Sequence, residues 1–162
     1  MKKLGILLIV ILIINVGFII GCIQRPQQAE EKHNEFVDWS EEQFNETANR
    51  IEHSYEIYKT GNWSNTLYHF SIIQDKINND IRQVNNFTLE EEILNSARNE
   101  FITWLNALKV VYDKWGSAVQ NFIDGNIIAG NSQFDEAQIL MKDTEVYVNN
   151  YKQYISEWRN EG

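Results

Sequence analysis

The chain has 162 residues, of which 43% are hydrophobic, and this is enough for one domain with a packed core. Acidic residues outnumber basic ones by 23 to 14, and the formal charge of −9 argues against a basic surface that binds nucleic acid. The single cysteine excludes a disulfide framework and a thiolate zinc site.

The N-terminus has the pattern of an export signal. Two lysines precede an apolar run over 4–20, and the run ends in Gly21 and the only cysteine, Cys22. This ending resembles the lipobox of membrane lipoproteins, archaeal ones among them, in which cleavage precedes a cysteine that receives lipid. The resemblance covers residues 1–22 alone and implies lipidation of Cys22, although Ile20 stands where a small residue is usual.

An uncleaved transmembrane helix is the main alternative to lipidation. Residues 4–23 are mostly apolar and would span about 30 Å as a helix, which is the thickness of a bilayer core. In either case the two N-terminal lysines favour the cytoplasmic side, so we expect membrane anchoring by the N-terminus with the domain on the outer side. A secreted protein without an anchor is the third possibility.

Composition divides the rest of the chain in two. Residues 23–33 contain a proline and several glutamines without an apolar period, and this predicts a flexible tether with a reach of about 18 Å. Residues 34–162 form the predicted helical domain. Three Asn-x-Ser/Thr sequons predict N-glycosylation at Asn45, Asn62 and Asn86, although such sequons also arise by chance in a chain rich in these residues.

The helical domain shows four segments with apolar residues spaced by three and four. Capping boxes predict helix starts at Ser40 and Thr88, and Gly61 and Gly125 are suited to end helices. The predicted helices are 40–60, 62–85, 88–124 and a last one that begins at either 126 or 132. Phe101, Trp104, Leu108 and Val111 belong to the strictest alternation and are predicted to be buried.

Short connections make neighbouring helices antiparallel. We therefore predict an all-α fold, an antiparallel up-down four-helix bundle of two αα-hairpins that follows the N-terminal apolar anchor or signal helix.

The sequence carries no pattern that predicts catalysis, a metal or a cofactor. It lacks the nucleophile elbow, the phosphate-binding loop and the dinucleotide fingerprint. His53 and His69 are equidistant from Gly61, so a hairpin would bring them level, but His53 is expected to face solvent. The only Glu-x-x-His motif, Glu30 to His33, falls in the predicted tether. We therefore expect a protein that is not an enzyme.

Two classes of function remain open. The first is a non-catalytic interaction or scaffolding module that contacts an unknown protein partner or a second copy. The second is a binder of a small ligand or an envelope polymer in an aromatic-lined cavity of the bundle. A cavity above about 300 Å³ would favour the second class, and a filled core with exposed apolar residues at one end would favour the first.

The helix lengths point to one end of the bundle as the partner surface. If the turn at 86–87 is tight, the third helix outruns the second by about 13 residues, or roughly 20 Å, and Gly61 lies level with Val111 and Tyr112. The tip beyond that level would either bend back at Gly116 or expose its apolar side chains. The predicted partner-binding residues are Trp115, Phe122, Ile123, Ile127 and Ile128.

Overall fold

The computed structural model describes residues 27–161, which fold entirely into helices and their connections. The helices are α2 (Gln27–Lys59), α3 (Trp63–Val84), α4 (Glu92–Ile123), α5 (Ile127–Asp143) and α6 (Glu145–Glu161). The predicted all-α class is confirmed for this part of the chain. The lipobox, Cys22 and the apolar N-terminal segment lie outside the described residues. None of the helices over 27–161 is both long enough and apolar enough to cross a membrane.

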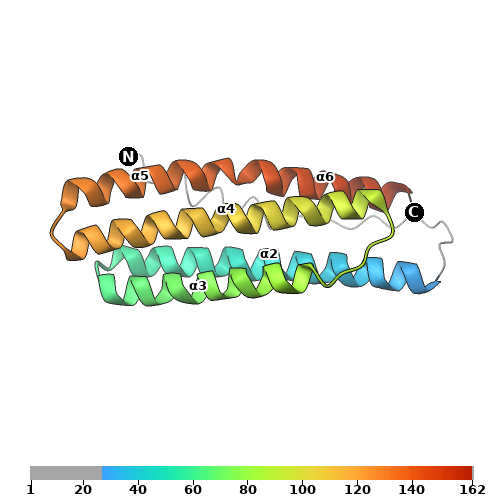
Figure 1. Cartoon of the computed structure of the whole chain (residues 1–162), viewed down its shortest axis with the longest axis horizontal. Coiled ribbons are helices and arrows are strands. Elements are labelled where there is room, and N and C mark those ends of the chain that lie inside the picture. The colour runs from blue at the N-terminus through green and yellow to red at the C-terminus, as the bar shows by residue number, and fades with distance from the viewer. Residues whose placement is uncertain (1–26, 162) are drawn as a thin grey trace.

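The helices lie side by side along one long axis (Figure 1). The chain reverses direction after α2, after α3 and after α4, whereas α6 continues the line of α5. α4 packs along α3 on one side and along α5 and α6 on the other. The predicted last helix is thus divided at Thr144, a buried residue whose hydroxyl donates to the carbonyl oxygen of Met141.

Two tight turns form as their sequences predict. Gly61 and Gly125 have φ values of 72° and 79°, a left-handed conformation that glycine adopts at little cost after a helix. The Asn62 side chain then caps α3 by accepting a hydrogen bond from the backbone N–H of Asn65. α3 begins and ends within one residue of the predicted bounds.

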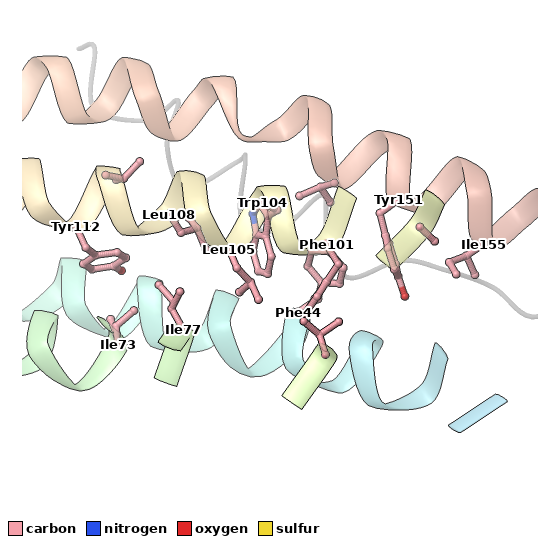
Figure 2. Packing of buried hydrophobic residues seen from close by; sticks show 14 of the residues in the cluster. Phe44, Ile73, Ile77, Phe101, Trp104, Leu105, Leu108, Tyr112, Tyr151 and Ile155 are labelled. Atoms are coloured by element: carbon pink, nitrogen blue, oxygen red, sulfur yellow. The ribbon is translucent and has the colours of Figure 1, made fainter. Parts of the chain in front are cut away.

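The core is centred on α4 (Figure 2). Phe101, Trp104, Leu108 and Val111 are at most 3% exposed, so their predicted burial is confirmed. The buried face of α4 is wider than one stripe because this helix has neighbours on several sides. Its further buried residues are Leu94, Ala97, Leu105, Tyr112, Trp115, Ala118 and Val119.

The predicted tether is wrong for residues 27–33, because α2 already begins at Gln27. The predicted cap at Ser40 is wrong for the same reason. Ser40 is buried inside the helix, and its hydroxyl bonds to the Val37 carbonyl and, at 2.5 Å, to the Tyr151 hydroxyl. The helix extends upstream because its buried face continues through Phe36 to His33. The apolar spacing in the sequence does not reveal this extension, because the buried residue at position 33 is a histidine.

The connection from α3 to α4 is longer than the predicted tight turn, and the predicted cap at Thr88 does not form. α4 begins only at Glu92, since Leu89 is drawn into the core and holds residues 88–91 outside the helix. The Asn95 side-chain amide donates to the Leu89 carbonyl at 2.8 Å, and Arg98 donates to the Phe87 carbonyl at 2.8 Å. The first turns of α4 thereby fix the path of this loop.

A buried ionic cluster joins α2 to α3. The Lys76 ammonium donates to both carboxylate oxygens of Asp80, at 2.9 and 3.2 Å, and to the Gln43 side-chain oxygen at 2.6 Å. It also lies 3.0 Å from a carboxylate oxygen of Glu46. Burial raises the pKa of Asp80, and the hydrogen bond from Lys76 opposes that rise. Lys76 and Asp80 both lie on α3, so the contacts of Lys76 with Gln43 and Glu46 are the ones that link the two helices, and a shift along the axis would break them.

Candidate functional site

Two of the predicted partner-binding residues, Trp115 and Phe122, stack against other aromatic rings, and Trp115 is part of the core. Trp115 is only 5% exposed and stacks against Phe70 and Phe134, with ring centroids 5.9 and 6.1 Å apart. Phe122 is half-buried and stacks on Trp63 at 5.1 Å. Trp115 is therefore wrong as a contact residue for a partner, whereas partner contact at the half-buried Phe122 stays a prediction.

The register of the hairpins explains this burial. The long connection over 85–91 lets α3 lie beside the last turns of α4, so Trp63 meets Phe122 and Gln74 donates to Asp113 at 2.6 Å. The Gly61 turn is thus close to the end of α4 and does not lie level with Val111–Tyr112. The predicted overhang of about 20 Å is wrong, and α4 runs through Gly116 as one helix.

Three other predicted residues remain exposed around the turn between α4 and α5. Ile123 is 45% exposed, Ile127 is 54% exposed and Ile128 is 88% exposed. They come from the last residue of α4 and the first two residues of α5, and we call them the isoleucine patch. The patch is apolar surface at the end of the described domain opposite the start of α2 (Figure 1).

A second candidate site is a groove near the opposite end, which we call the Trp39 groove. It is half-open and has a volume of about 390 Å³. Its walls come from α2, from the end of α3 and from the loop that follows. The lining residues are Lys32, Glu35, Trp39, Gln83, Asn86, Phe87 and Thr88.

Two aromatic rings form the apolar wall of the groove. The rings of Trp39 and Phe87 are 5.2 Å apart, and both side chains are half-buried. The indole N–H of Trp39 donates to the Gln83 side-chain oxygen at 3.1 Å, which holds the indole in place. Phe87 also packs edge-on against Phe36, and its backbone is fixed by Arg98. The groove therefore has a firm apolar wall beside polar side chains.

Sequence reasoning missed this groove for two reasons. It assigned Lys32 to a flexible tether and treated 86–87 as a minimal turn, so neither segment could form a wall. A usable signal was present in the aromatic residues Trp39 and Phe87, which flank the two segments that the helical pattern left unexplained.

The histidines occupy two different environments. His53 and His69 lie level as predicted, with ring centroids 5.1 Å apart, and His53 is exposed. His33 does not lie in a tether: it is 2% exposed, and its Nδ1 is 3.3 Å from a carboxylate oxygen of Glu91. Over the described residues, no three His, Cys, Asp or Glu side chains are grouped so that they could hold a metal ion.

The asparagines of the three sequons are all exposed, although Thr47 of the first sequon is buried. Asn45 is exposed on α2, Asn62 caps α3, and Asn86 lies in the loop where it lines the Trp39 groove. Glycosylation at these positions stays a prediction from the sequence.

Comparison with known proteins gives no assignment for either site. No protein family matches the chain, and neither the curated proteins nor the solved structures contain a match. The isoleucine patch and the Trp39 groove are therefore interpreted from their own geometry and chemistry.

Proposed function

We propose that this protein is a membrane-anchored, extracytoplasmic interaction or scaffolding module without catalytic activity, built as an antiparallel up-down four-helix bundle. The isoleucine patch is the observation that carries this proposal. Three exposed isoleucines at one end of a domain with a buried aromatic and aliphatic core are a feature of contact surfaces. Each buried Å² of apolar surface contributes about 25 cal/mol to association.

The patch and the N-terminal end of α2 lie at opposite ends of the described domain (Figure 1). α2 has 33 residues, which corresponds to a length of about 50 Å. An anchor at Cys22 or in the preceding apolar segment would therefore hold the patch away from the membrane. Copies anchored in one membrane would present their patches at the same height, and this raises their effective concentration. A second copy is thus the partner that the geometry favours.

Aspartate substitutions in the patch should weaken this self-association. We expect Ile127→Asp and Ile128→Asp to reduce the cross-linked dimer of the full-length protein in phospholipid bicelles by about tenfold, since each places a charge against apolar surface. Thermal unfolding followed by circular dichroism should change little because both residues are exposed.

Ile139→Asp is the matched control for the patch. Ile139 is 63% exposed and lies on α5 away from the turn. A parent protein that stays monomeric, or a dimer that Ile139→Asp disrupts equally, would contradict the patch as a site of self-association. Loss of a different co-purified protein in the patch variants would identify a heterologous partner in place of a second copy.

The membrane anchor has its own test at Cys22. We expect Cys22→Ser to leave the precursor uncleaved and to remove the mass of the lipid, because lipid attachment needs the thiol and precedes cleavage. Intact-mass spectrometry of the native protein and of the variant measures both changes. An unmodified cysteine in an uncleaved chain would instead support the retained transmembrane helix.

A further inference from the structure

We propose that the Trp39 groove binds a neutral saccharide. Its two half-buried rings, Trp39 and Phe87, have centroids 5.2 Å apart, and both line the groove as its apolar wall. The C–H faces of a sugar ring are apolar and can cover such a wall, while its hydroxyl groups point outward from the ring. Aromatic side chains beside hydrogen-bonding groups therefore suit this class of ligand.

The polar rim supplies the hydrogen-bonding groups. Gln83 and Asn86 carry side-chain amides that both donate and accept, and Thr88 carries a hydroxyl that does the same. These three residues come from the end of α3 and the loop after it, which Arg98 and Asn95 hold in place. A fixed rim lowers the entropic cost of binding.

Charge argues against ionic ligands. The groove contains one cation, Lys32, and one anion, Glu35, so their charges balance. The chain as a whole has a formal charge of −9, which repels phosphate-rich or sulfated polymers. The volume of about 390 Å³ is at the lower end of the range for small-molecule sites, which suits a short saccharide segment.

The position of the groove agrees with such a ligand if the chain is anchored as proposed. Lys32 lies five residues after the start of α2 at Gln27, so the groove is near the end that the N-terminal segment would attach to the membrane. Surface glycans close to the membrane would then be within reach. Binding itself needs no anchor, so a failed anchoring test leaves this proposal intact.

Titration of the full-length protein with trisaccharides tests the proposal. The probes are N-acetylglucosamine and mannose trisaccharides, added to isotope-labelled protein from a non-glycosylating host in phospholipid bicelles. The readout is the nuclear magnetic resonance signal of the Trp39 indole N–H, identified by its loss in Trp39→Phe. We expect at least one probe to shift this signal in a saturable way, with a dissociation constant on the order of 1 mM.

Rim variants and a charged probe make the test specific. Asn86→Ala and Thr88→Val should each weaken binding about fivefold, whereas Asn79→Ala, an exposed change on α3 outside the groove, should leave it unchanged. The proposal is overturned if neither trisaccharide shifts the signal at 20 mM, on the order of twenty times the expected constant. It is also overturned if Asn79→Ala weakens binding equally or if a sulfated trisaccharide binds more tightly than the neutral ones.

Discussion

Replacing Trp104 with alanine should cost about 3–5 kcal/mol of unfolding free energy, the range for a large aromatic removed from a packed core. Trp104 is 3% exposed and packs against Phe44, at 4.3 Å between ring centroids, and against Phe101, at 5.7 Å. Figure 2 shows these rings where α2, α4 and α6 meet. Domains are commonly stable by about 5–15 kcal/mol, so this change removes a large share of the total.

Denaturant unfolding followed by circular dichroism measures this loss. Asn106→Ala is the matched control because Asn106 lies two residues away on the exposed face of α4, and its effect should stay within about 0.5 kcal/mol. A loss below about 1 kcal/mol for Trp104→Ala is less than a cavity of that size ordinarily costs, and it would contradict the assignment of Trp104 to the packed core.

Replacing Lys76 with methionine should cost about 3 kcal/mol at neutral pH. Lys76 is the cation that pairs with Asp80, and the Asp80 side chain is 2% exposed. Removing one partner of a buried ion pair leaves the other charge without compensation, which is far more costly than losing a surface pair. Lys114→Met is the control, since the pair of Lys114 and Glu136 is exposed and should be worth less than about 1 kcal/mol.

The loss in Lys76→Met should depend on pH in a defined direction. Burial already raises the pKa of Asp80 in the parent protein, and removal of Lys76 raises it further. The folded state then binds a proton more tightly than the unfolded state, so stability rises as pH falls through the raised pKa and is lost as pH rises through it. Lys76→Met combined with Asp80→Asn should recover most of the stability at neutral pH; an unchanged or larger loss in the double variant would contradict the ionic explanation.

Local sequence was sufficient to predict the elements that depend on local chemistry. Gly61 ends α2 and Gly125 ends α4 because only a residue without a side chain adopts their positive φ freely. The three-and-four spacing through Phe101 and Trp104 predicted which face of α4 is buried, since a helix buries residues that recur at its own period. His53 and His69 lie side by side as predicted, because they are equidistant from the Gly61 turn that joins two antiparallel helices.

The same local rules failed wherever a residue's role depended on a distant partner. Ser40 matched a capping box, yet its hydroxyl contacts Tyr151 from the far end of the chain. Thr88 matched another, yet burial of Leu89 keeps the loop from joining α4. In each case the sequence motif was compatible with a cap, and long-range packing provided the lower free energy.

The sequence by itself determined the helical class, the helix-ending glycines and the buried face of α4, because periodicity and backbone conformation act over a few neighbouring residues. Only the tertiary structure decided the register of the helices, that is, how they are aligned with one another along the long axis. That register buries Trp115, covers part of Phe122, leaves Ile127 and Ile128 exposed, and places Trp39 beside Phe87. It depends on the loop path and on the fit of many side chains from different helices, and no single segment of the sequence contains that information.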